Sequence, residues 1–321
     1  MISTICKNIT GAVSAIILSA NTLFCVIALV VPVTILKLTI RFKPATVFFD
    51  KVLNGISLFW TRGNNTALML TRKIVWTVQG TETLEKNKWY LVISNHQSWT
   101  DIMVLQKILY GKVPFIKFFL KKELIWVPVL GMAWWALDFP FMKRYSKEFL
   151  EKNPHLKGKD IEITKKACAK FSHIPVSIMN FVEGTRFTAE KHDRQNSPFR
   201  NLLKPKSGGI GFVFSTMGQQ LSSILDITIV YPGGPYSFWD FLCGQVTDIR
   251  VDVQEIPVTE KIRGDYVNDA AYRDRFQHWL NDLWEEKDLK IDLMLDRTNP
   301  AANIPEQRQH ETGNTEMTEY N

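Results

Sequence analysis

Paired cysteine motifs are absent from this chain. Its four cysteines (Cys6, Cys25, Cys168 and Cys243) lie far apart, and no CxxC occurs. A disulfide framework or a structural zinc site is therefore not expected, and reduced thiols facing the cytoplasm are the simpler interpretation. A Walker phosphate-binding loop is also absent, because residues 204–209 have the wrong order of glycines, lysine and serine. The chain contains no internal repeat.

Charged residues are missing from Ile9–Leu36. This stretch is long enough to cross a bilayer as a helix. A cleaved signal peptide is the alternative, since Ser19-Ala20 are small, but the apolar run continues well beyond them and favours an uncleaved anchor. Asn21 and Pro32 leave open a kinked or re-entrant segment in place of one straight span.

Cations are unevenly distributed around this uncharged segment. Lys37, Arg41, Lys43 and Lys51 follow it, whereas only Lys7 precedes it. Cytoplasmic flanks carry an excess of lysine and arginine. We therefore expect a membrane protein whose remaining chain lies on the cytoplasmic face.

The overall composition suits a membrane-associated enzyme. The chain has 321 residues, of which 45% are hydrophobic, with ten Trp and twenty Phe. Its net charge is +7 and its pI about 9.1, which suits anionic lipid surfaces, phosphorylated substrates or nucleic acid. The tail is polar and is expected to be disordered. The expected division is an anchor (1–45), an α/β domain (46–296) and the tail (297–321).

A second apolar run, Leu124–Leu137, is interrupted by Pro128 and Gly131 and is too short to span a bilayer comfortably. Its tryptophans and the lysines before it are typical of a membrane interface. A hydrophobic core helix is the alternative, and the sequence does not choose between the two.

Short aromatic and β-branched runs alternate with helical patterns, which predicts an α/β fold. Strands are expected at 74–78, 88–94, 173–180 and 224–232, an edge strand at 249–253, and a short apolar strand before Lys143-Arg144. Helices are expected at 49–70, 101–109, 145–170, 210–217 and 269–289, and a polar loop at 187–203.

The strand at 88–94 ends by delivering His96 into a loop, and Asp101 follows five residues later. On one continuous helix these side chains would point about 140° apart. They can meet only if His96 precedes the helix and Asp101 lies in its first turn. Ser98–Asp101 resembles a capping box, with Ser98 as N-cap and Asp101 as its N3 partner. The alternative is that Asp101 only caps the helix.

Two further predicted strands end in polar groups. One ends at Arg144, and the other leads into Glu183-Gly184-Thr185-Arg186, where the glycine lets backbone N–H groups and a guanidinium converge on an anion. An exposed turn with a surface ion pair is the alternative. Ligands gather at the carboxyl ends of strands in open α/β sheets. A base beside two arginine-bearing loops therefore indicates an alcohol substrate that carries a phosphate, and the anchor favours a lysophospholipid.

These segments together resemble the lysophosphatidic acid acyltransferase (1-acylglycerol-3-phosphate acyltransferase) family of membrane enzymes. The likeness covers roughly residues 75–232. Its four blocks are similar to Asn95–Asp101 (NHxSxxD), Phe141–Arg144, Phe181–Arg186 (FPEGTR) and Ile229–Pro232. Val182 replaces the usual proline of the third block, and Asp138 stands where the second block often has glycine. The region after Val246 lies outside the blocks, as in larger bacterial-type members with a C-terminal extension.

The resemblance implies a single α/β acyltransferase domain with a mixed sheet flanked by helices, and a general base, His96, oriented by Asp101. It implies that the acceptor phosphate is bound by Arg144, Glu183, Gly184, Thr185 and Arg186. It implies no metal and no cofactor, with acyl-CoA or an acyl carrier protein thioester as co-substrate. The expected reaction acylates a lysophospholipid, most simply lysophosphatidate, at a membrane such as the bacterial inner membrane.

Two other classes of protein share part of this pattern. A non-catalytic membrane scaffold could carry the anchor and the Trp-rich run, but it has no need of His96, Asp101 and the two arginines at successive strand ends. A basic nucleic-acid-binding protein could share the charge and the aromatics, but it has no need of the uncharged N-terminal segment. The expectation is therefore an enzyme without a nucleic-acid partner.

Overall fold

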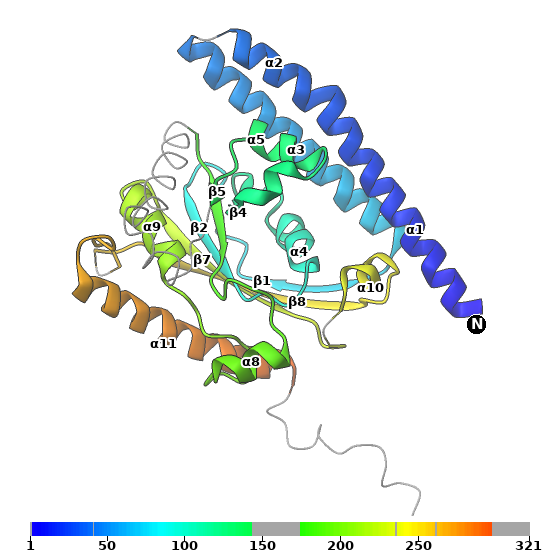
Figure 1. The fold of residues 1–321 in the computed structure, drawn as a ribbon. Helices are drawn as coiled ribbons and strands as arrows, with labels where there is room; N and C mark the ends of the chain where they lie inside the picture. Colours follow the sequence, from blue (N-terminus) through cyan, green and yellow to red (C-terminus); the bar gives the residue numbers. More distant parts are fainter. Residues whose placement is uncertain (1, 41, 143–173, 235, 261, 297–321) are drawn as a thin grey trace, which may run out of the picture.

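The computed structural model describes residues 2–40, 42–142, 174–234, 236–260 and 262–296. Three predictions fall outside these residues: the polar helix at 145–170, the disordered tail at 297–321 and the position of Arg144. Figure 1 shows a sheet with helices on both sides and a pair of long helices along one flank.

The sheet has six strands in the order β1-β8-β7-β2-β6-β3. Their bounds are β1 Val75–Gln79, β2 Tyr90–Ser94, β3 Ile116–Phe118, β6 Ser177–Phe181, β7 Ser223–Val230 and β8 Asp248–Pro257. The strands β3, β6, β2 and β7 run parallel to one another, whereas β8 is antiparallel to β7 and parallel to β1. The sheet is therefore mixed, which confirms the predicted fold class.

The predicted position of β8 at an edge is wrong. β8 lies between β1 and β7, and the short, largely exposed β1 forms the edge. The alternating pattern has another cause: Ile249, Val251 and Val253 face the core, whereas Arg250 and Gln254 lie on the less covered face. Alternation of apolar and polar residues indicates that one face of a strand is exposed to solvent, and an internal strand of a sheet can also have such a face.

The central strands are buried on both faces. Along β2, Leu91 and Ile93 pack into the core beneath α9 (Gly208–Met217) and α11 (Ala270–Met294). Tyr90 and Val92 pack into the core beneath α3 (Lys43–Thr71) and α4 (Thr100–Leu109). Strands covered on both sides become continuous apolar runs, and this explains the composition that identified β2 in the sequence.

Helices of several lengths surround the sheet. They are α4 Thr100–Leu109, α5 Leu130–Ala136, α8 Ala189–Gln195, α9 Gly208–Met217, α10 Phe238–Leu242 and α11 Ala270–Met294, with a 3₁₀ turn η2 at Lys122–Trp126. The helix α8 lies where a loop was predicted, and the side chain of Thr188 caps it by accepting the Lys191 N–H.

β5 (Phe141–Met142) pairs with β4 (Leu120–Lys121) in a separate two-stranded sheet, so the strand before Arg144 does not belong to the main sheet.

The region after Val246 completes the fold. It supplies β8 and α11, and α11 carries the fully buried Lys287 to β7. The Nζ of Lys287 forms an ion pair with Asp226 at 2.8 Å and donates to the Ile227 carbonyl and the Thr228 hydroxyl. Burial lowers the pKa of Lys287 and raises that of Asp226. Removing one partner would leave an uncompensated buried charge, so α11 is an integral part of this domain.

The N-terminal segment is helical throughout. α1 (Ile2–Leu23), a π-helical turn η1 (Phe24–Val30) and α2 (Val31–Thr39) follow one another directly, and α3 (Lys43–Thr71) returns beside them (Figure 1). Proline lacks an N–H and crowds the preceding turn; the wider π-helical turn just before Pro32 accommodates it. The helix α3 runs across the expected domain boundary at residue 45.

Polar contacts join the two long helices. The Asn21 Nδ2 donates to the Trp60 carbonyl at 2.9 Å and to the Asn64 Oδ1 at 2.8 Å, and the Trp60 Nε1 donates to the Thr22 hydroxyl at 3.0 Å. A Cβ at Gly63 would lie 2.6 Å from the Asn21 Oδ1, so only glycine permits this approach. Small residues and side-chain amides hold apolar helices together in the same way in membranes.

Candidate active site

Three parallel strands deliver the candidate residues to one edge of the sheet. β2, β6 and β7 run in the same direction, so their carboxyl ends lie together. His96 follows β2, the Glu183–Arg186 turn follows β6, and Tyr231 follows β7. The position is the one that ligands occupy in open α/β sheets.

His96 and Asp101 meet, under the condition that the sequence set for this contact. α4 begins at Thr100, so Asp101 lies in its first turn and His96 in the loop before it. The His96 Nδ1 lies 2.8 Å from the Asp101 Oδ2. Since that oxygen also accepts the backbone N–H groups of Gln97 and Ser98, it acts as a carboxylate acceptor, and Nδ1 carries the proton. The Nε2 lone pair is then available as a base.

The capping and orienting roles of Asp101 are not alternatives, because one buried carboxylate performs both. The predicted role of Ser98 is wrong in detail: the N-cap position is Trp99, and the Ser98 hydroxyl accepts from the N–H of Thr100 and donates to the Tyr236 carbonyl at 2.8 Å. The loop turns one residue later than the box pattern predicts.

Two residues that the sequence did not single out hold the histidine loop. The ring of Phe181 stacks on the His96 ring, with centroids 3.8 Å apart and planes 12° apart. The side chain of Asn95 donates to the Ile229 carbonyl and accepts its N–H, at 2.8 and 2.9 Å, which fastens the loop to β7. Both residues belong to the blocks that carry the resemblance, but nothing in their spacing predicts these contacts.

Glu183 is buried, and both of its carboxyl oxygens are occupied. Oε1 accepts the backbone N–H of His96 at 2.9 Å, and Oε2 accepts that of Leu203 at 3.0 Å. The structure therefore gives Glu183 a different position from the expected substrate contact: it links the turn after β6 to the backbone of His96. Burial raises the pKa of Glu183 to about 8.

The rest of the turn is accessible. Gly184 has φ +73°, a conformation that glycine adopts without strain. The Lys191 Nζ donates to the Thr185 hydroxyl and to the Arg186 carbonyl, both at 2.9 Å. The Arg186 guanidinium lies over the Trp99 ring, 5.3 Å from its centroid. Lys191 thus adds a second cation to the predicted anion site. The sequence analysis did not identify Lys191, because it did not predict α8, the helix that places this side chain beside the turn.

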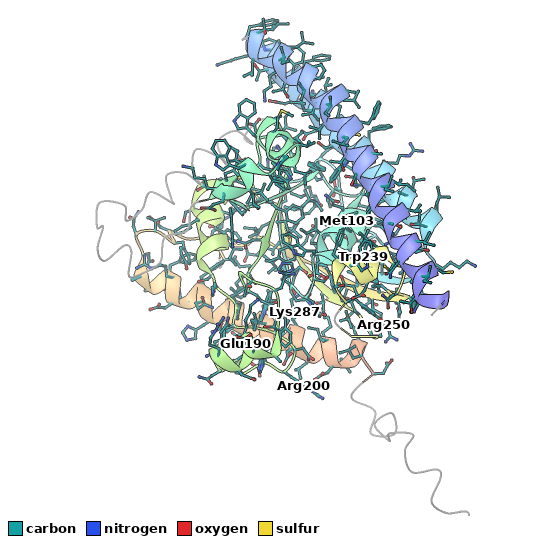
Figure 2. The ribbon with its side chains drawn as sticks, turned by 45° about the vertical axis from the view of Figure 1, so that its right-hand side comes forward. Met103, Glu190, Arg200, Trp239, Arg250 and Lys287 are labelled. Atoms are coloured by element: carbon teal, nitrogen blue, oxygen red, sulfur yellow. The ribbon has the colours of Figure 1, made fainter. Side chains whose placement is uncertain are left out.

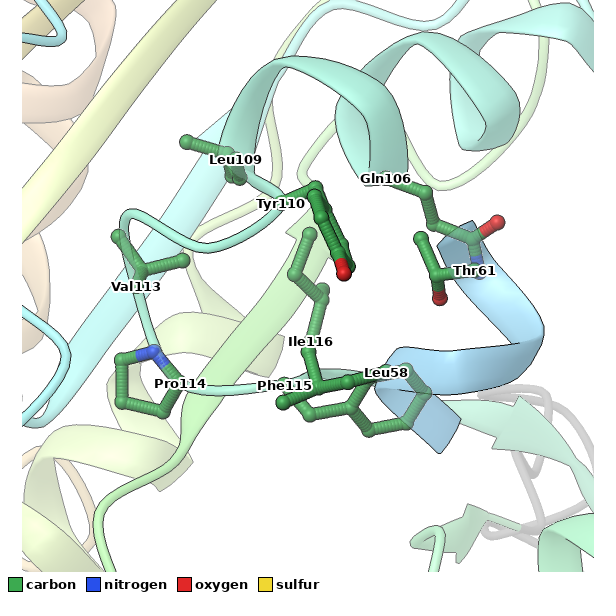
Figure 3. Close-up of a pocket in the computed structure, with 9 residues that line it drawn as sticks. All are labelled: Leu58, Thr61, Gln106, Leu109, Tyr110, Val113, Pro114, Phe115 and Ile116. Carbon is green, nitrogen blue, oxygen red and sulfur yellow. The ribbon is translucent and has the colours of Figure 1, made fainter. Parts of the chain in front are cut away.

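A pocket between α3 and α4 holds no more than about one water molecule. It has a volume of about 10 Å³, and Leu58, Tyr110 and Phe115 are among its lining residues (Figure 3). This volume is near the lower limit for a single water, so the pocket is a packing gap and not a ligand site. Among the described residues, no three His, Cys, Asp or Glu side chains gather closely enough to hold a metal ion.

The raised pKa of Glu183 predicts a pH-dependent stability. The folded-state pKa of about 8 lies above the ordinary glutamate pKa of 4.5, so this group's contribution to stability is complete below about pH 4.5 and is lost as the pH rises through 8. The free energy of unfolding should fall between pH 5 and 8, by at most about 1.4 kcal/mol per pH unit. Denaturant melts of Glu183→Gln should show a flatter profile, whereas Glu190→Gln on the exposed face of α8 should not. Equal slopes in wild type and Glu183→Gln would contradict this.

Comparison with known proteins gives consistent matches. The model of the Acyltransferase family matches residues 75–231. A yeast (Saccharomyces cerevisiae) 2-acyl-1-lysophosphatidylinositol acyltransferase is 28% identical over 62% of this chain and 59% of its own length. The mouse 1-acyl-sn-glycerol-3-phosphate acyltransferase epsilon is 24% identical over 68% of this chain and 61% of its own. The chicken lysocardiolipin acyltransferase 1 is 26% identical over 63% and 52%.

The matches therefore span less than two thirds of these relatives' lengths. Among solved structures, the 1-acyl-sn-glycerophosphate acyltransferase of Thermotoga maritima matches with a TM-score of 0.55 and 15% identity, over 89% of this chain and 98% of that one. At this identity the match shows a common fold.

Proposed function

We propose that the protein transfers a fatty acyl group from an acyl thioester to the free hydroxyl of a lysophospholipid, in keeping with the match of residues 75–231 to the model of the Acyltransferase family. The observation that carries this proposal is the 2.8 Å contact between His96 and the buried Asp101, beside the accessible turn that bears Arg186. A membrane scaffold would have no use for an oriented base at this position.

The chemistry needs only an oriented base and a bound acceptor. His96 takes the proton of the acceptor hydroxyl as its oxygen attacks the thioester carbonyl carbon. The new ester C–O bond forms, the C–S bond breaks, and the leaving thiolate takes the proton back from His96. Asp101 stabilises the imidazolium between these steps. The thioester is already activated, so the proposed reaction uses no metal and no cofactor; acyl-CoA or acyl carrier protein supplies the acyl group.

The acceptor is proposed to be a lysophospholipid whose phosphate lies at the turn after β6. Arg186 and Lys191 provide positive charge there, and Gly184 is exposed and adds no side chain that would block the turn. A guanidinium and an ammonium together suit a phosphate. Arg144 is a further predicted ligand from the sequence. Lysophosphatidate is the simplest acceptor that carries both the phosphate and the free hydroxyl.

Lipid mass spectrometry tests the acceptor and the acyl chain together. Cells that produce the wild-type protein should accumulate one diacyl phospholipid at the expense of its lyso form, and cells that produce His96→Ala should not. The head group of the depleted lipid identifies the acceptor. Unchanged lysophospholipid and phospholipid profiles, with both proteins present at equal levels in membranes, would contradict the proposed reaction.

We also propose that the N-terminal helices attach the protein to the membrane while lying along the domain. The helix Thr4–Thr39 is long and apolar enough to cross a bilayer. However, it touches the domain at both ends: the Asn8 Oδ1 accepts from the Trp239 Nε1 on α10 (Figure 2), and Lys37 pairs with Asp50 and Asp138 at 2.6 and 3.0 Å. Its outer face is lined by exposed apolar side chains, including Ile9, Ile16, Phe24, Ile27 and Ile35.

Because the N-terminal helix is held against the domain at both ends, we favour the re-entrant alternative, in which the outer face of this helix lies in one leaflet of the bilayer. The cytoplasmic side is proposed from Lys43 and Lys51, which are exposed. Lys37 is a weaker indicator, because two carboxylates within the protein already neutralise it. A bacterial inner membrane remains the proposed location.

A second lipid contact is proposed at η2 and α5. The short helix α5 buries its small residues, Gly131, Ala133 and Ala136, whereas Trp135 is 47% exposed and Trp126, in η2, is 85% exposed. A core helix would show the opposite arrangement. Large exposed tryptophans are typical of a membrane interface, and α5 contacts α2 and η1, so this surface continues that of the N-terminal helix.

Deleting the residues before Thr46 should release only part of the protein from membranes, because the η2–α5 surface remains. Trp126→Ala with Trp135→Ala should release more of the truncated protein, whereas Trp279→Ala on α11, which lies beneath the opposite face of the sheet, should not. Flotation with vesicles that contain anionic lipid measures the bound fraction. A fully soluble and active truncated protein would rule out the second contact.

A further inference from the structure

Tyr231 lies directly behind the candidate base. Its hydroxyl donates to the Asp101 Oδ1 at 2.7 Å, and the residue is only 3% exposed. Burial raises the pKa of Tyr231 well above its usual value, so the phenol keeps its proton and remains a donor. The hydrogen-bonded series formed by His96, Asp101 and Tyr231 therefore extends from the accessible edge of the sheet into its core.

The backbone around Tyr231 explains why the hydroxyl reaches Asp101. Ile227, Ile229 and Tyr231 alternate on the face of β7 that α4 covers, and Asp101 lies in the first turn of α4. The next residue is Pro232, and a residue before proline is restricted to extended conformations. Tyr231 thus continues the direction of the strand, and its ring extends under the start of α4.

The two oxygens of Asp101 have separate sets of donors. Oδ2 receives His96 Nδ1 and the N–H groups of Gln97 and Ser98, whereas the hydrogen bond to Oδ1 comes from Tyr231. With donors on both oxygens the carboxylate cannot rotate away from the imidazole. The phenol also stabilises negative charge on Asp101, which keeps the shared proton on His96.

We propose that Tyr231 is a positioning residue of the site, acting through Asp101 to hold His96 in the tautomer and orientation that acyl transfer needs. This inference rests on the proposed function. Tyr231 contacts neither substrate in this account, so its loss should affect turnover and leave acceptor binding unchanged.

Tyr231→Phe removes only the hydroxyl and tests the inference. It should lower kcat on the order of tenfold and leave KM for lysophosphatidate within about twofold. Tyr90→Phe is the matched control, because Tyr90 is a buried tyrosine of the same core whose hydroxyl bonds Glu85 N–H at the opposite end of β2. The control should keep its kcat. A kcat of Tyr231→Phe equal to that of wild type would overturn the proposal.

A double-mutant cycle separates action through Asp101 from an independent effect. In the Asp101→Asn background, Tyr231→Phe should cause no further loss of residual activity, since groups that act as a unit are not additive. The full loss in that background would overturn the proposal. Melting temperatures give the same comparison without any substrate. The sum of the Tm losses of Asp101→Asn and Tyr231→Phe should exceed the Tm loss of the double variant. Additive losses would show that the two residues are uncoupled.

The same measurements distinguish this inference from the proposed function. If wild-type protein acylates no lysophospholipid, the proposed function fails, and the melting temperatures alone decide whether Tyr231 and Asp101 act together. If wild type is active and Tyr231→Phe matches it, only the inference fails.

Discussion

Asp101→Asn should leave the protein folded and lower kcat for acyl transfer about a thousandfold or more. The amide oxygen can replace Oδ2 and keep the N–H groups of Gln97 and Ser98, and the amide NH₂ can donate to the Tyr231 oxygen. The stability loss should therefore be about 1 kcal/mol. The amide has no charge with which to stabilise imidazolium, so the rate falls while the fold persists.

The matched comparisons are His96→Ala and the double variant. His96→Ala should be at least as inactive as Asp101→Asn, and the double variant little worse than either, because the two residues act as a unit. Turnover is measured per folded molecule, with the folded fraction taken from circular dichroism. Normal turnover in Asp101→Asn together with a large drop in Tm would mean that the carboxylate only caps α4.

Arg186→Ala should lower kcat/KM for lysophosphatidate more than tenfold, about 2 kcal/mol of transition-state stabilisation. The physical reason is the loss of a charge-assisted contact that both binds the phosphate and fixes the distance from the hydroxyl to His96. Steady-state kinetics with one acyl-CoA measure the effect.

Two controls separate this contact from a general loss of charge. Arg194→Ala removes an exposed cation from the nearby α8 and should change kcat/KM by less than about threefold. A monoacylglycerol acceptor lacks the phosphate, so its slow acylation should be insensitive to Arg186→Ala. Equal losses with both acceptors, or no loss with lysophosphatidate, would place Arg186 outside the phosphate site.

The sequence predicted those parts of the site that depend on local order along the chain. A buried strand, a loop and a helix start in succession are enough to bring His96 to Asp101. Asp138 stands where the second block of the resembling family often has glycine, and its φ is +57°, in the left-handed region that glycine favours.

The sequence could not predict contacts that depend on which strands become neighbours. Tyr231 reaches Asp101 only because β7 lies beside β2, and Phe181 reaches His96 only because β6 pairs with β2 on the other side. Glu183 was expected at the substrate because its turn resembles the third block of the acyltransferase family. The structure instead buries it against two backbone N–H groups, a contact that only tertiary packing determines.

Purified protein in vesicles, supplied with lysophosphatidate and an isotopically labelled acyl-CoA, tests directly whether His96 and Asp101 catalyse acyl transfer. We expect labelled phosphatidate and one free CoA thiol per acyl group transferred, with neither formed by Asp101→Asn or His96→Ala above about a thousandth of the wild-type rate. Transfer by His96→Ala at the wild-type rate would contradict the claim that His96 is the base. Thiol release without an acylated lipid would show that the thioester is hydrolysed and that the lysophospholipid is not the acceptor.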